Sequence, residues 1–159
     1  MQKLVVREGD LVTIQVTLTV PSAASAVETS TSPALAPPPP AFRLQGSAGF
    51  RVEGHVACVP GDIESLRIEG VPYVVPPAFP VPGAGTVELK VPKRNRAQYA
   101  RTTQGKEVVV DGGPLELVFT PTTAARILNP PAEDKEKEYE GTAVLTCVRA
   151  WPVTAGPAT

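Results

Sequence analysis

The segment 11–20 (LVTIQVTLTV) has the clearest β-strand pattern in the chain. The even-numbered positions are all apolar, namely Val12, Ile14, Val16, Leu18 and Val20. The odd-numbered positions after Leu11 are all threonine or glutamine. A period of two predicts a strand with one buried face and one face that is solvated or meets another protein. Because one strand cannot bury its apolar face alone, the rest of the chain must supply a sheet around it.

The composition favours short strands over helices. Nineteen prolines and 13 glycines are spread over 159 residues, and both residue types mark turns and interrupt helices. Alternating runs recur at the spacing that is typical of sandwiches and barrels. We therefore predict an all-β fold: a compact single domain over residues 1–159, with about eight or nine short strands arranged as a cone, sandwich or barrel. Long proline-rich loops are expected to join the strands.

Two stretches lack a strand pattern. Residues 21–40 are rich in alanine, serine and proline, and they end in four consecutive prolines. We interpret them as a loop insertion that is extended where the prolines follow one another. Residues 152–159 follow the last predicted strand, a position where chains commonly fray, and they predict a flexible tail.

Glycine and proline also guide the interpretation of the second half of the chain. Two β-rich runs, 106–110 and 114–120, flank Asp111-Gly112-Gly113, which predicts a β-hairpin. Residues 70–85 contain five prolines, which cannot donate to a ladder, so they predict an edge segment or an ordered loop. Three further polar stretches are expected to be a short helix or loop, a turn of helix and a solvated loop, namely 93–104, 122–128 and 133–138.

Charge and composition argue against several functions. The net charge of −1 provides no positive field for nucleic acid or an anionic membrane, and aromatic residues make up only 5% of the chain. No apolar run approaches the ~20 residues of a membrane-spanning helix. Charged residues interrupt the N-terminal segment, so we expect no signal peptide and synthesis in the cytoplasm. Later assembly into an exported particle stays open.

One group of residues has metal-ligand character. His55 and Cys58 are separated by two residues, and Cys147 lies far downstream. Imidazole and thiolate are the ligands that zinc prefers. Residues three apart on an unbroken strand point to opposite faces, so a shared ion requires a bulge or turn near His55. The alternatives are a disulfide and buried cysteines that pack as small apolar side chains.

The chain contains no recognisable reaction centre. There is no nucleophile elbow, phosphate-binding glycine loop or paired carboxylate motif. With one histidine in the sequence, any histidine-dependent site has to use His55. We therefore do not expect an enzyme. A small hydrolase or metalloenzyme built on His55 is the alternative.

Three motifs follow one another in the middle of the chain. They are GHVACVPGD at 54–62, a Leu-x-Ile-x-Gly-x-Pro-Tyr pattern at 66–73 and a proline- and glycine-rich pattern at 80–89. Together with residues 102–108, they resemble the small PAAR-like proteins of bacterial contractile injection and type VI secretion systems. The resemblance covers about 50–119.

The resemblance implies a β-rich cone that sits on the blunt end of a trimeric spike protein, sharpens it and sometimes carries effector cargo. In a cap of this kind, one chain contacts all three chains of the spike. Its base is therefore expected to show pseudo-threefold character. The family's zinc site is built mainly from several histidines and a cysteine. In this chain, which has one histidine, the implied ligands are His55 and Cys58, with Cys147 matched by position alone.

We accordingly expect a structural tip or spike-associated component of a contractile injection apparatus, with zinc as its candidate cofactor. Its expected partners are a trimeric spike protein and effector cargo. The alternative is a stand-alone β-sandwich that binds carbohydrate or peptide. That function requires a concave patch of aromatic side chains, for which Tyr73, Phe79 and Trp151 are the candidates.

Overall fold

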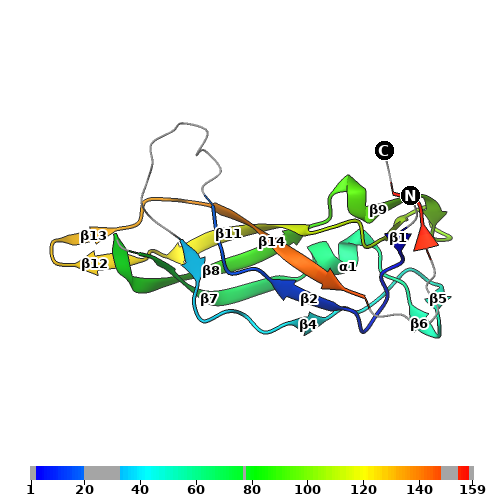
Figure 1. Ribbon diagram of the computed structural model, residues 1–159, viewed down its shortest axis with the longest axis horizontal. Coiled ribbons are helices and arrows are strands. Elements are labelled where there is room, and N and C mark those ends of the chain that lie inside the picture. The colour runs from blue at the N-terminus through cyan, green and yellow to red at the C-terminus, as the bar shows by residue number, and fades with distance from the viewer. Residues whose placement is uncertain (1–2, 20–32, 77, 148–153, 158–159) are drawn as a thin grey trace.

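A computed structural model of the chain describes residues 3–19, 33–76, 78–147 and 154–157. These residues form an elongated body that is built almost entirely of antiparallel strands (Figure 1). The prediction of an all-β fold is confirmed. Among the described residues, helix is limited to α1 (Pro60–Glu64) and the short 3-10 turn η1 (Lys93–Asn95).

The strands follow one another along the whole described chain. In order, they are β1 (Lys3–Leu4), β2 (Leu11–Ile14), β3 (Ala34–Leu35), β4 (Phe42–Arg43), β5 (Arg51–Val52), β6 (His55–Val56), β7 (Arg67–Val75), β8 (Phe79–Lys90), β9 (Arg96–Arg101), β10 (Glu107–Val109), β11 (Leu115–Thr123), β12 (Arg126–Leu128), β13 (Pro131–Glu133), β14 (Tyr139–Thr146) and β15 (Thr154–Ala155).

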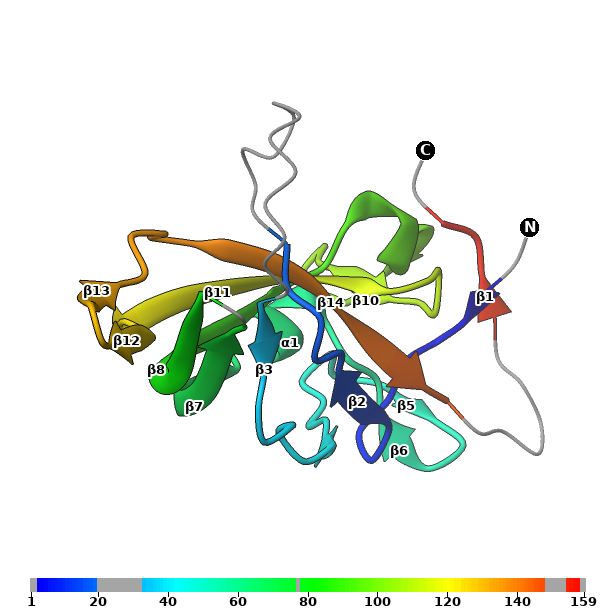
Figure 2. The same cartoon turned by 60° about the vertical axis from the view of Figure 1, so that its left-hand side comes forward.

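The main sheet contains nine of these strands and curls around its own core (Figure 2). Its order is β13-β12-β8-β11-β14-β2-β4, and β7 pairs with β8 on one side and β3 on the other. The curl closes where Thr17 forms a bridge with Ala34 and the Leu35 amide donates to the Val16 carbonyl at 2.8 Å. Of the expected arrangements, the fold is therefore nearest to a barrel.

The interior of the curl holds the larger of two apolar clusters. Tyr73, Phe119 and Tyr139 lie at its centre, each at most 1% exposed. The Tyr73 and Phe119 rings meet edge to face, with their centroids 5.0 Å apart, an arrangement that aromatic pairs favour. The alternating apolar residues Val12, Ile14 and Leu18 point into this cluster as predicted.

A smaller apolar cluster fills what we call the end lobe, formed by β1, β5, β6, β9, β10 and β15. It lies at the opposite end of the body from the β12–β13 hairpin (Figure 1). Within 108–110 the side chains alternate: Val108 and Val110 belong to the smaller cluster, whereas Val109 belongs to the larger one. This segment is therefore a wall that both clusters share.

The predicted hairpin around Asp111-Gly112-Gly113 is wrong in its pairing. β10 pairs with β9, and β11 pairs with β8 and β14 instead. The reason is tertiary: the Asp111 amide donates to the Leu4 carbonyl at 2.8 Å, and Gly112 lies against the backbone of Arg94. The two glycines carry the chain from the end lobe into the main sheet.

The proline-rich segment 70–85 is also not an edge. It forms most of the hairpin between β7 and β8, and β8 is central, with β7 and β11 on its two sides. The ladder between β7 and β8 shifts register between Tyr73 and Val75. Pro80 and Pro82 fall within this shift, where the missing amide hydrogens cost no ladder hydrogen bond.

Helix was expected in two places where strands form. Most of the polar stretch 93–104 is β9, which follows η1, and residues 122–128 end β11 and form β12. Pairing with β10 and with β8 and β13 overrides the weak helical preference of both stretches. The described helix α1 begins at Pro60. At its start, Asp62 Oδ2 accepts a hydrogen bond from the Val59 amide at 2.9 Å.

The predicted loop insertion and tail lie partly outside the described residues. Of 21–40, residues 21–32 are not described, and Ala34–Leu35 form β3. Of 152–159, Thr154–Ala155 form β15 and pair with Lys3–Leu4, while 152–153 and 158–159 are not described. The division into a single domain with an insertion and a tail remains a prediction.

Candidate functional site

The three candidate zinc ligands come from different environments. His55 is exposed in β6, directly after a turn in which Glu53 and Gly54 have positive φ. Cys58 is fully buried in the larger cluster, where its thiol lies 3.7 Å from the Gln45 carbonyl. Cys147 packs partly buried against the same cluster, and both cysteines are thiols.

A zinc ion shared by His55 and Cys58 requires a bulge or turn near His55. The structure has such a turn at Glu53 and Gly54, directly before His55. In the part of the chain that the structure describes, no group of three or more His, Cys, Asp or Glu side chains is placed to hold a metal ion. Zinc binding by His55, Cys58 and Cys147 stays a prediction.

A ring of three backbone hydrogen bonds lies where the end lobe meets the main sheet. The Val6 amide donates to the Val109 carbonyl, the Val109 amide to the Cys58 carbonyl and the Cys58 amide to the Val6 carbonyl, each at 2.9 Å. All three residues are fully buried. Three segments that are far apart in sequence thus meet head to tail in a closed ring of hydrogen bonds.

The flanking residues repeat this arrangement in part. Val5 forms a bridge with Val110, and Arg7 forms a bridge with Ala57. The side chains of Val5, Ala57 and Val108 enter the smaller cluster, whereas those of the three ring residues enter the larger one. The ring is therefore a point at which the end lobe and the main sheet are tied together.

The surface of the end lobe carries balanced charge and the strongly exposed aromatic ring of Tyr99. Arg96 pairs with Glu64 at 3.2 Å and Glu107 at 3.5 Å, and Arg101 pairs with Glu107 at 3.7 Å. These residues line a groove of about 500 Å³, but the carboxylates offset its positive charge. Tyr99 is 82% exposed on β9.

The opposite end is a narrow hairpin with an apolar tip. β12 and β13 pair from Arg126 opposite Glu133 to Leu128 opposite Pro131. Leu128 is 67% exposed. The base of the hairpin is anchored by Asp134, which was expected in a solvated loop but is buried and accepts hydrogen bonds from Tyr73 and Tyr139. That expectation is wrong for Asp134.

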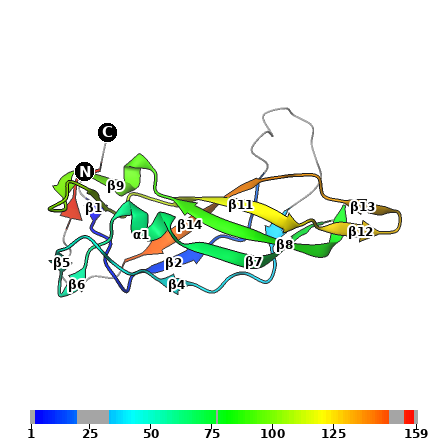
Figure 3. The same ribbon diagram turned by 180° about the vertical axis from the view of Figure 1, so that it is seen from behind.

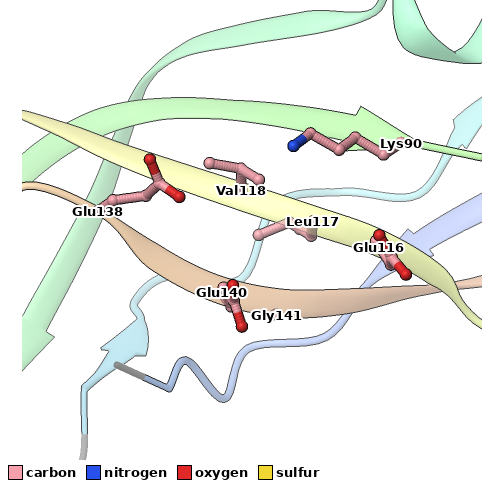
Figure 4. Close-up of a pocket in the computed structure, with 7 residues that line it drawn as sticks. All are labelled: Lys90, Glu116, Leu117, Val118, Glu138, Glu140 and Gly141. Atoms are coloured by element: carbon pink, nitrogen blue, oxygen red, sulfur yellow. The ribbon is translucent and has the colours of Figure 1, made fainter. Parts of the chain in front are cut away.

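A shallow acidic groove of about 300 Å³ crosses the outer face of the main sheet (Figure 4). Glu116 of β11 and Glu140 of β14 lie in it, together with Glu138, and Lys90 of β8 is the basic residue among them. Among the described residues, the three glutamates do not form a group that could hold a metal ion. We therefore interpret this groove as a solvated sheet face.

The alternative of a ligand-binding sandwich depended on an aromatic patch. Tyr73 is fully buried, and Phe79 packs partly buried against the larger cluster. Trp151 lies outside the described residues. The two described candidates therefore help to fill the core and do not form an open concave patch.

The fold and the surfaces define an elongated all-β body with a ring of three hydrogen bonds at its junction, a broad lobe at one end and a narrow hairpin at the other. The sequence matches the family model of the contractile injection system spike tip protein over residues 1–156. The chain belongs to this family of spike tip proteins. A comparison with curated proteins finds no match.

Family membership establishes the coarse role. The protein is a spike tip component of a contractile injection system, so it forms part of an injection particle, and the family suggests association with a spike protein. The family is structural and typically non-enzymatic. In the described residues, no helix is long and apolar enough to cross a membrane.

Proposed function

We propose that the protein caps the end of a trimeric spike protein, with its end lobe on the spike and its β12–β13 hairpin pointing away. The observation that carries the proposal is the ring formed by Val6, Cys58 and Val109. A single chain that caps three identical chains is expected to show pseudo-threefold character. The ring brings three buried backbone segments together head to tail where the end lobe meets the main sheet.

The shapes of the two ends support this orientation. The end lobe is broad and carries the exposed ring of Tyr99, and exposed tyrosines often anchor protein interfaces. The hairpin ends in Leu128, Asn129 and Pro130, which are exposed and uncharged. A narrow leading end and a broad seated end suit a body that is pushed forward along its long axis.

The test combines stoichiometry with one variant at each end. The purified protein is mixed with the trimeric spike protein of the same apparatus and weighed by native mass spectrometry; we expect one tip chain per spike trimer. Tyr99→Asp should weaken binding about tenfold or more, because it places a charge in the interface. The matched Leu128→Asp variant should bind normally.

Each alternative result is decisive. Three tip chains per trimer, or no complex at all, contradicts capping by a single chain. Loss of binding in Leu128→Asp with normal binding in Tyr99→Asp reverses the proposed orientation.

The proposal includes linkage of effector cargo and a mechanical role without turnover, within a type VI secretion system or another contractile apparatus. Both follow the PAAR-like resemblance of residues 50–119. Cargo linkage predicts that effectors co-purify with the assembled tip. Any catalytic turnover that disappears in His55→Ala contradicts the mechanical role.

We retain zinc as a candidate cofactor within this proposal. His55, Cys58 and Cys147 are its candidate ligands, and imidazole with thiolates suits zinc. Elemental analysis of the purified protein decides the point: one zinc per chain that is lost in Cys58→Ser supports the site, and absence of zinc rejects it.

A further inference from the structure

The wall of the curled sheet has an unpaired stretch, which we call the window, between residues 37–43 and the start of β7. β4 is the last strand of the sheet order, and within the described chain Arg67 and Ile68 pair with β8 alone. Hydrogen bonds close the window at both ends. The Ala36 amide donates to the Pro72 carbonyl at 3.1 Å, and the Ser47 amide donates to Asp62 Oδ2 at 3.0 Å.

The window contains an apolar groove of about 330 Å³. Its lining is Pro39, Pro40, Phe42, Leu66 and Ile68, with Arg43 and Arg67 beside them. Three consecutive residues, 66–68, line the groove on the side of β7. An extended chain advances about 3.3 Å per residue, so they span about 10 Å. That length suits three or four residues of an extended segment.

Proline explains why the window stays open. Residues 37–40 are all proline, so they have no amide hydrogen with which to pair across the gap. The facing edge at Arg67 and Ile68 retains an ordinary backbone, whereas the Leu66 amide already donates to the Ile63 carbonyl at 3.0 Å. An apolar floor beside an unpaired strand edge is the geometry at which proteins add a strand from a partner.

The charges beside the groove indicate what such a strand carries. Arg67 pairs with Glu69 at 3.3 Å and with Glu88 at 3.5 Å. Arg43 is exposed and has no ion pair in the described part of the chain. A partner with a carboxylate opposite Arg43 would complement this charge.

We propose that the window binds an extended segment of another protein, which adds to the β7 edge, places apolar side chains on the proline floor and sets a carboxylate against Arg43. The window lies along the flank, between the end lobe and the hairpin (Figure 3). This binding is therefore separate from the capping of a spike at one end, and it provides a second attachment point on the same body.

The test uses a synthetic seven-residue peptide of alternating valine and threonine with one central aspartate, and the same peptide with lysine. Fluorescence anisotropy with the full chain should show saturable binding, about fivefold tighter for the aspartate peptide. Arg43→Glu should reverse this preference. The matched control Arg126→Glu, on the exposed β12, should leave the preference unchanged.

A second variant and a backbone measurement separate the window from other surfaces. Pro40→Trp fills the groove from an exposed position, so binding should be lost while the unfolding midpoint stays the same. Bound peptide should also slow amide hydrogen exchange at residues 67–69. This slowing distinguishes strand addition from a contact made by side chains alone.

Besides the absence of peptide binding, three outcomes overturn the proposal. They are equal affinity for the two peptides, binding that survives Pro40→Trp, and a dimer of this chain that Pro40→Trp dissolves, which assigns the groove to a second copy. Normal capping of the spike with no peptide binding rejects the window alone and leaves the proposed function intact.

Discussion

The hydroxyl of Tyr139 donates to Asp134 Oδ2 across 2.7 Å inside the protein. Tyr73 donates to the same oxygen at 3.0 Å, and its own oxygen accepts the Ala125 amide at 3.0 Å. The other carboxylate oxygen accepts the Glu136 amide at 3.0 Å. One carboxylate therefore joins β7, β14 and the base of the β12–β13 hairpin, which gives a projecting hairpin a rigid foundation.

The first prediction is that Asp134→Ala lowers the free energy of unfolding by about 2–4 kcal/mol, because it leaves two buried phenols without their acceptor. Urea denaturation measures the change. The control is Glu133→Ala, an exposed neighbour, which should stay within about 0.5 kcal/mol of the original protein. Equal effects of the two substitutions would show that the buried carboxylate contributes no special stability.

The second prediction concerns alkaline pH. Burial raises the pKa of Tyr73 to about 12. The hydrogen bond from the Ala125 amide lowers this pKa, whereas the hydrogen bond to Asp134 and its charge raise it. Burial and the hydrogen bond to Asp134 also hold the pKa of Tyr139 far above its usual value. The unfolded phenols lose their protons near pH ~10. The neutral phenols therefore stabilise the fold fully below that pH, and this contribution is lost as the pH rises toward 12.

Melting temperatures between pH 8 and 12 test this dependence. The original protein should lose stability steeply above pH ~10. The Tyr73→Phe, Tyr139→Phe double variant is less stable at neutral pH but should show a shallower alkaline decline. An identical decline in both proteins would assign the effect to other groups.

The strand pattern of the fold was predictable because it is local. In segment 11–20, period-two alternation correctly placed Val12, Ile14 and Leu18 in the core. It failed at Val16, which is 38% exposed where the chain bends. The bend depends on the closure of the curl with β3, which is a tertiary contact that no local pattern encodes.

The errors share that cause. The charge run 133–138 gives no sign that Asp134 is buried, because its partner Tyr73 lies 61 residues away. Gly112 suggested a hairpin, whereas its role is close approach to another segment. The resemblance over about 50–119 predicted a spike tip of a contractile injection system, but the ring of Val6, Cys58 and Val109 joins segments whose spacing in sequence carries no periodic signal.

The third prediction separates the two roles of glycine. A Cβ at Gly112 would overlap the carbonyl oxygen of Arg94. Because this oxygen belongs to the backbone, it cannot move aside as easily as the end of a flexible side chain. Gly112→Ala should therefore cost about 1–3 kcal/mol of stability by overpacking. Gly61 in α1 has open space around its Cβ position, so Gly61→Ala should be neutral or should stabilise by about 0.5–1 kcal/mol. Thermal unfolding of both variants checks the difference.

The fourth prediction is that the end lobe and the main sheet unfold together. Val109 packs in the larger cluster while Val108 and Val110 pack in the smaller one, so neither cluster can open without disrupting the other. Calorimetry should show one transition whose calorimetric and van't Hoff enthalpies agree. Val109→Ala should lower the single midpoint, at a cost of about 1–3 kcal/mol. Two separated transitions, with only one shifted by this substitution, would instead mean that the lobe is an independent domain.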